Sequence, residues 1–342
     1  MTGEHSVGWG DGAGRRGWGD GAGATGLGRR GLGGGAGPVR SDDVPPYRNR
    51  PRRAAVIGTV VLLLLAVAGY LIDHSFQLVS PVVAAPGCQA GSGGQAIALE
   101  PDQAAIAATI AGVAARHKLP RQAVTIAYAA ALQESDLHNL DYGDRDSVGV
   151  FQQRPSQGWG PASDLKNPIY ATTKFFDALV RVRHYTTVPI QAAAQAVQHS
   201  ADGAAYGQWA TVAAQLAGYF TGSSPRGVSC WYVPAPKAPR ANLAGAERGL
   251  TQTFGPQGRE AVVVGITTDR SGPHGDGSIA VVHVQRARAW TVAGWLVAHA
   301  QAYGVSEVRY AGYDWQPANG NMGWQRETGK DPPGGSSSIV AG

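Results

Sequence analysis

Nineteen consecutive uncharged residues at positions 54–72, AAVIGTVVLLLLAVAGYLI, limit the structures that this chain can form. A helix of this length is about 28 Å long, which matches the hydrocarbon thickness of a bilayer. A helix buried in a soluble core normally keeps a polar stripe, and this run has none. The run is therefore predicted to be a transmembrane helix, and a cleaved signal peptide is the alternative.

Basic residues are concentrated on the N-terminal side of this run. Four arginines lie within six residues before it, and the next Lys or Arg after it is Arg116. The positive-inside rule then keeps the N-terminus in the cytoplasm and exports residues 73–342. Because more than fifty residues precede the run, it does not resemble a signal peptide. We expect a single-pass anchor in the cell membrane with the C-terminal domains outside the cytoplasm.

The net charge of +5 arises mainly from the N-terminal tail. Nine Arg and five acidic residues before residue 54 contribute +4, which leaves +1 for the remaining chain. A nucleic-acid-binding domain needs its basic excess on a folded face, so nucleic acid is not an expected partner. The tail is also rich in glycine and repeats Gly-Trp-Gly-Asp-Gly-Ala-Gly, which predicts disorder.

Two cysteines, Cys88 and Cys230, flank a segment of about 140 residues. Thiols outside the cell membrane tend to oxidise, so we expect a disulfide bond that joins the two ends of one domain. The alternative is a pair of unrelated free thiols. No metal or cofactor is expected, since His283 and His299 do not have a recognisable ligand spacing.

Apolar residues between the cysteines recur with a helical period. Helices are predicted to begin near residues 101, 121, 168, 189 and 204, and a small β element is predicted between residues 138 and 160. Beyond residue 249, strand patterns at residues 260–268, 278–285 and 305–310 and a helix pattern at residues 289–303 predict a small α+β module. The expected segments are a disordered cytoplasmic tail (1–53), the membrane helix (54–72), a linker (73–100), a mainly α domain with a small β element (101–232), a second linker (233–248), the α+β module (249–330) and a disordered tail (331–342).

Glu134 is the main candidate for chemistry. It lies at the end of an Ala-rich helix, and an apolar flank would raise its pKa so that it holds a proton near neutral pH. Such a carboxyl group can donate its proton to a leaving oxygen. Asp144 and Asp146 follow in the next loop and supply two further carboxylates. Amide and aromatic side chains nearby suit recognition of an acetamido sugar.

The pair Glu134-Ser135, followed by Ser-Val-Gly-Val-Phe-Gln at residues 147–152, resembles the signature of the goose-type lysozyme and soluble lytic transglycosylase superfamily. The run at residues 143–160 is most similar to a divergent actinobacterial, membrane-anchored branch of that superfamily. The resemblance covers about residues 101–220 and implies a lysozyme-like fold. It also implies that the substrate is peptidoglycan.

The resemblance further implies roles for single residues. Glu134 would protonate the glycosidic oxygen between N-acetylmuramic acid and N-acetylglucosamine. Lytic transglycosylases need no second carboxylate and release an anhydro sugar, whereas an inverting hydrolase needs a base such as Asp144 or Asp146. Gln198 and Ser200 are the nearest replacements for an Ala-Tyr-Asn-Ala-Gly-like element that this chain lacks. The expected substrate-binding residues are Ser135, Ser147, Gln152, Gln153, Trp159, Tyr170, Gln198, Ser200 and Tyr206.

The sequence therefore predicts a membrane-anchored peptidoglycan glycosidase, either a muramidase or a lytic transglycosylase. The alternative is a catalytically inactive lysozyme-like protein that binds peptidoglycan or serves as a cell-wall scaffold. In both cases residues 249–330 are expected to dock other cell-wall machinery.

Overall fold

The computed structural model describes residue 67 and residues 85–200, 203–232, 241–269, 279–327 and 338–342. Residues Val79–Gly342 form one compact unit of helices and two small antiparallel sheets. Except for Val67, the predicted tail and membrane helix lie outside the described residues. In the described part of the chain, no helix combines the length and apolar character needed to cross a bilayer.

The predicted helices at residues 101, 121, 168, 189 and 204 are confirmed, with small changes at their ends. The last begins as a short 3-10 helix, η3, before α7. Local signals explain these starting points: Gln103 accepts a bond from the Glu100 backbone at the start of α2, and Asn167 caps α5. The helices are α2 (Pro101–Arg116), α3 (Arg121–Ser135), α5 (Pro168–Leu179), α6 (Ile190–Gln198), η3 (Ala205–Trp209) and α7 (Ala210–Phe220).

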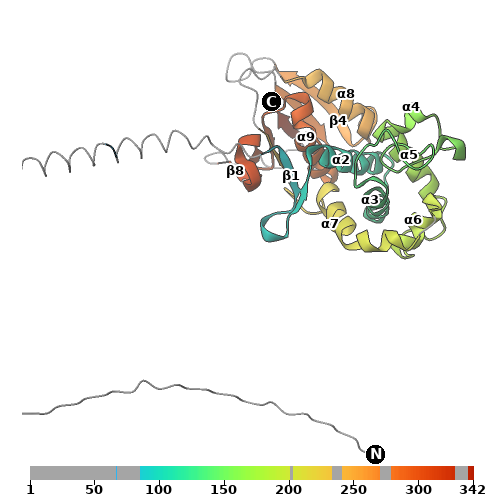
Figure 1. Ribbon diagram of the computed structural model, residues 1–342. Coiled ribbons are helices and arrows are strands. Elements are labelled where there is room, and N and C mark those ends of the chain that lie inside the picture. Colours follow the sequence, from blue (N-terminus) through green and yellow to red (C-terminus); the bar gives the residue numbers. More distant parts are fainter. Residues whose placement is uncertain (1–66, 68–84, 201–202, 233–240, 270–278, 328–337) are drawn as a thin grey trace, which may run out of the picture. The chain divides into compact units, whose positions relative to one another are not determined.

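Helix α3 lies at the centre of the helical part and is seen nearly end-on in Figure 1. It packs against α2, α5, α6 and α7, and residues 123–132 are buried on every side. Six of these ten residues are alanine or other small residues, which lets the neighbouring helices approach closely. The helix ends where Asp136 adopts a left-handed conformation, with φ of 52°. This termination leaves Glu134 in the last turn, at the edge of the core.

The smaller sheet has the order β2-β1-β3 and joins the two ends of the helical part. Strand β1 (Gly87–Ala90) pairs with β2 (Ile97–Leu99) and with β3 (Val228–Trp231). The short helix η1 (Gly93–Gln95) connects β1 to β2. The prediction of a linker over residues 73–100 is therefore wrong for residues 87–99. These strands are only three or four residues long, too short for a clear alternation of side chains.

The larger sheet has the order β4-β5-β9-β6-β7-β8. Strands β4, β5 and β6 confirm three predicted strands, but β9 falls in the tail that was predicted to be disordered. Helix α8 (Leu243–Phe254) likewise begins inside the predicted second linker. The strands are β4 (Val263–Asp269), β5 (Ile279–Val284), β6 (Val308–Tyr310), β7 (Tyr313–Trp315), β8 (Gln325–Arg326) and β9 (Ser338–Ala341).

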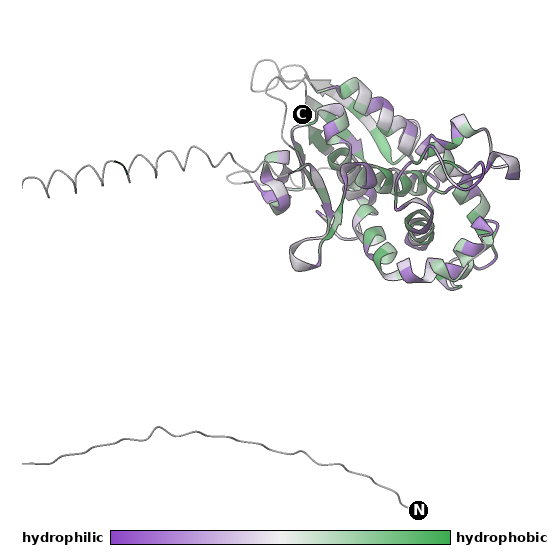
Figure 2. Cartoon of the chain, in the orientation of Figure 1, coloured by the Kyte–Doolittle hydropathy of each residue, from purple (hydrophilic) through white to green (hydrophobic). Residues whose placement is uncertain are grey.

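Helices α9 (Ala289–Ala298) and α10 (Ala300–Tyr303) complete this C-terminal part, which packs directly on the helical part. Helix α9 contacts α2, and α8 approaches so closely that a Cβ atom on Gly112 of α2 would lie 2.4 Å from Thr253. Figure 2 shows helix α2 mostly in the hydrophobic colour, whereas α8 carries hydrophobic and hydrophilic residues along its length. The predicted module over residues 249–330 thus shares its core with the helices instead of standing apart. The remaining short helices are η2 (Pro155–Gln157), α4 (Ala162–Leu165), η4 (Arg286–Arg288) and η5 (Pro317–Met322).

Candidate functional site

Glu134 and Tyr206 meet at the end of α3. The Tyr206 hydroxyl donates a hydrogen bond of 2.5 Å to Glu134 Oε1, and the Ser200 side chain is hydrogen-bonded to Tyr206 in turn. Tyr206 is fully buried, while Glu134 is half-buried. Glu134 and Tyr206 are 72 positions apart in the sequence, and the contact between α3 and η3 brings them together. The hydrogen bond holds one carboxylate oxygen of Glu134 in a fixed position.

Burial raises the pKa of Tyr206 far above its usual value, and the hydrogen bond and charge of Glu134 raise it further. The phenol consequently keeps its proton throughout the neutral range and always acts as a donor to Glu134 Oε1. Among the described residues, none donates a hydrogen bond to the second oxygen, Oε2. One carboxylate oxygen of Glu134 is thus held by Tyr206, and within the described residues the other accepts no hydrogen bond.

The loop at residues 147–153 is fastened to the helices by side chains that the sequence analysis assigned to substrate binding. The Ser135 hydroxyl donates to the carbonyl oxygens of Val150, at 2.7 Å, and Ala131, at 3.2 Å. The amide of Gln198 donates to the Phe151 carbonyl at 2.8 Å. These bonds place the loop between α3 and α6. Because both side chains donate to backbone carbonyls, Ser135 and Gln198 act as positioning residues for the loop.

Within this loop, the polar side chains also bond to the protein backbone. The Gln152 amide donates to the carbonyls of Tyr142 and Gly149, and Gln152 itself has φ of 45°. Gln153 is buried and donates to the Ala171 carbonyl at 3.2 Å. Ser147 is also buried. The small β element predicted between residues 138 and 160 is reduced to one β-bridge between Val148 and Gln153.

The two candidate bases have different surroundings. The Asp144 side chain is 91% exposed and lies 3.8 Å from Arg145. Asp146 accepts hydrogen bonds from Arg154 Nε at 2.8 Å, from the Ser156 backbone at 2.7 Å and from the Ser156 hydroxyl at 3.0 Å. These bonds, led by that of Arg154, hold the pKa of Asp146 well below its usual range. A carboxylate so strongly stabilised is a poor proton acceptor, and its contacts show that it closes the loop at residues 146–156.

The aromatic candidates are only partly accessible. Trp159 and Tyr170 are half-buried, and Trp159 packs on the core. A Cβ atom at Gly160 would lie 2.4 Å from the Tyr170 hydroxyl, and the Lys174 ammonium lies 5.3 Å from the Tyr170 ring centre. The complete burial of Tyr206 removes it from the surfaces on which a sugar ring can stack.

Gln133 is a site residue that sequence analysis missed. Its Oε1 atom accepts hydrogen bonds of 2.9 Å from Gln208 and from the Trp209 indole. This cluster lies beside Glu134 and ties the end of α3 to η3 a second time. The signal in the sequence was an amide in the last turn of an otherwise apolar helix.

In the described residues, no three side chains of His, Cys, Asp and Glu converge as the ligands of a metal ion would. The candidate site consists of the half-buried carboxyl group of Glu134, its donor Tyr206, and a loop that is held by side-chain amides and the Ser135 hydroxyl. Neither a scan of protein-family models nor a search of curated proteins found a match for this chain.

Proposed function

We propose that this chain is a peptidoglycan glycosidase in which Glu134 is the general acid. The observation that supports this most strongly is the asymmetry of the carboxyl group: Tyr206 occupies Oε1, and Oε2 accepts no hydrogen bond from the described residues. A proton on Oε2 is then available to a glycosidic oxygen. Half-burial of Glu134 also limits competition from water.

Proton transfer from Glu134 Oε2 to the bridging oxygen breaks the bond between that oxygen and C1 of the muramyl residue. The hydrogen bond from Tyr206 stabilises the carboxylate that results. Glu134 can next accept the proton of the muramyl C6 hydroxyl while that oxygen bonds to C1. This second step yields a 1,6-anhydro sugar and restores the acid.

The surroundings of the two aspartates favour this lytic transglycosylase route over hydrolysis. Asp146 is committed to Arg154 and Ser156, and Asp144 projects into solvent. An inverting hydrolase needs a carboxylate base about 6.5–9.5 Å from its acid, poised to accept a proton from water. Neither aspartate has the free, partly desolvated carboxylate that this task requires.

The location of the protein follows from the predicted span at residues 54–72 and from the disulfide. A bond between Cys88 and Cys230 is typical of proteins in oxidising compartments. We therefore infer a single-pass protein with the N-terminus inside and the catalytic unit outside the cell membrane. This arrangement would keep the activity close to the glycan strands of the wall.

The test compares the full chain with two charge-matched variants on purified peptidoglycan. Glu134→Gln should abolish release of soluble fragments, because its amide cannot donate a proton as an acid does. Asp144→Asn removes the same charge from an exposed position and should retain activity. Mass spectrometry of the products should find anhydro ends. Equal glycan binding with no fragments from any of the three proteins would refute catalysis and support the scaffold alternative.

A further inference from the structure

A cavity of about 710 Å³ lies between segments that are far apart in the sequence. The end of α2 contributes Arg116 and Lys118, the turn after α8 contributes Arg259, and η4 contributes Arg288. Its volume falls within the roughly 300–1,000 Å³ that is usual for small-molecule sites. None of its lining residues belongs to the Glu134 site, so the two sites are separate.

The lining of this cavity is strongly cationic. Its four basic side chains are opposed by one carboxylate, Glu260, which gives a net charge of +3 (4 − 1). Within the described ranges, none of the four cations forms an ion pair. Arg116, Lys118 and Arg259 are exposed, and Arg288 is half-buried. The convergence of four cations from three segments, with one carboxylate and no ion pair in the described part of the chain, indicates a place for an anion.

The arginines are suited to a phosphate group. Arg116 is anchored by a hydrogen bond of 3.3 Å from Nη1 to the Gln252 carbonyl, and its aliphatic part lies beside Gly255. This contact orients the guanidinium group before any ligand arrives. Planar guanidinium groups bind phosphate through paired hydrogen bonds, which a lysine cannot reproduce. Three of the four cations are arginines, which favours phosphate recognition over diffuse charge attraction.

The cavity also has an apolar wall. Phe254 and Val262, both nearly fully buried, line it together with Ala115 and Ala261. A free phosphate ion would leave this wall and most of the volume unused. A diphosphate ester would carry about three negative charges at neutral pH, and its organic part would cover the apolar wall. We propose that this cavity binds the diphosphate ester of an organic molecule.

Such a ligand would contact both α2 and the C-terminal elements α8 and η4. The ligand would thereby connect the helical part that carries Glu134 with the C-terminal part, for which the sequence analysis predicted only a docking role. The proposal does not depend on glycosidase activity, because no residue of the cavity takes part in that mechanism.

Isothermal titration calorimetry of the full chain at low salt tests the proposal. The probes are inorganic diphosphate, adenosine diphosphate as a soluble ester, farnesyl diphosphate as a lipid-like ester, and citrate as a carboxylate control. Arg259→Gln with Arg288→Gln removes two cations from the cavity. Arg121→Gln with Arg326→Gln removes the same charge from exposed positions outside it. Glu260→Gln removes the only opposing charge of the lining.

We expect at least one ester to bind at least tenfold more tightly than inorganic diphosphate and citrate. The cavity double variant should weaken that binding at least tenfold, the control double variant less than twofold, and Glu260→Gln should strengthen it at least twofold. The ester that binds more tightly identifies a soluble or a lipid source. Absence of ester binding, equal binding of citrate, or equal losses in both double variants would each overturn the proposal.

Discussion

Replacement of both cysteines by alanine tests how the ends of the helical part are held together. Cys88 and Cys230 lie directly opposite each other in β1 and β3, and their disulfide closes a loop with a sequence separation of 142. The chain-entropy model assigns such a loop about 5 kcal/mol at 25 °C. Domains of this kind have a total free energy of unfolding of only about 5–15 kcal/mol. Removal of the disulfide should therefore eliminate a large fraction of the stability.

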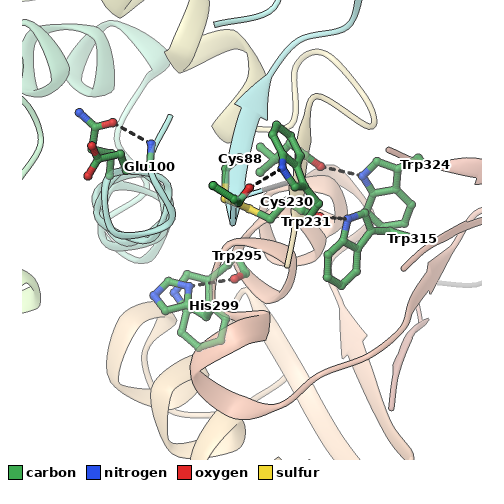
Figure 3. Close-up of a disulfide and its surroundings, with 11 residues drawn as sticks. Cys88, Glu100, Cys230, Trp231, Trp295, His299, Trp315 and Trp324 are labelled. Carbon is green, nitrogen blue, oxygen red and sulfur yellow. Dashed lines mark hydrogen bonds between the residues drawn. A yellow bond between two sulfur atoms is a disulfide. The ribbon is translucent and has the colours of Figure 1, made fainter. Parts of the chain in front are cut away.

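The native sheet should survive this substitution, because the neighbouring bonds use backbone carbonyls. The indole of Trp315 donates to the Cys230 carbonyl at 3.1 Å, and that of Trp324 donates to the Val228 carbonyl at 2.8 Å. Figure 3 shows both indoles beside the disulfide. The cost should therefore arise mainly in the unfolded chain, which gains freedom when the loop opens.

Urea unfolding followed by circular dichroism measures the effect. The free energy of unfolding of the double variant should be lower by about 4–5 kcal/mol, with an unchanged spectrum in the absence of urea. Wild-type protein in reductant is the control and should match the variant. A loss below about 1 kcal/mol would refute the reasoning, because loop closure in the unfolded chain would then contribute little.

Three further perturbations have defined outcomes. Tyr206→Phe removes the donor to Glu134 and should lower kcat on peptidoglycan about 10- to 100-fold with little change in KM; an unchanged kcat would contradict its positioning role. Gly149→Ala should lower the free energy of unfolding by about 1–3 kcal/mol, as measured in urea, because φ is 78° and the new Cβ would lie 2.4 Å from the Leu165 carbonyl oxygen. Burial lowers the pKa of His299 to about 4, so between about pH 6.5 and 4 the unfolded chain binds a proton that the folded chain does not. The stability should therefore fall by roughly 3 kcal/mol as the pH drops through this window, and His299→Gln should flatten the pH profile in urea titrations.

The helices were predictable from the sequence because their signals are local. A proline at the first position of α2 and of α5 and a helical period of apolar residues mark their positions. Strands β1 and β3 were missed because their pairing joins residues 142 positions apart and because each strand has only four residues. Their cysteines carried the only signal, and that signal predicted the contact between the two ends.

The sequence pointed to several residues of the candidate site but not to their hydrogen-bond partners. Glu134 and Tyr206 were both singled out, yet nothing in the sequence indicated that one would bond to the other. Ser135 and Gln198 were expected to bind substrate, but they donate to backbone carbonyls of the loop, and a local sequence pattern does not reveal which acceptor the fold supplies. Asp146 differs, because Arg154 lies eight residues away in the same loop and could have been considered as its partner.

Strand β9 has a consequence for the synthesis of the chain. It lies between β5 and β6 and pairs antiparallel with both, so it connects the β4-β5 pair to the β6-β7-β8 ribbon. Until residues 338–341 leave the ribosome, β5 and β6 each present an unpaired backbone edge that another chain could occupy. A nascent chain that stalls before this point would expose two unpaired strand edges that promote aggregation. It would depend on chaperones to remain soluble until β9 is synthesised.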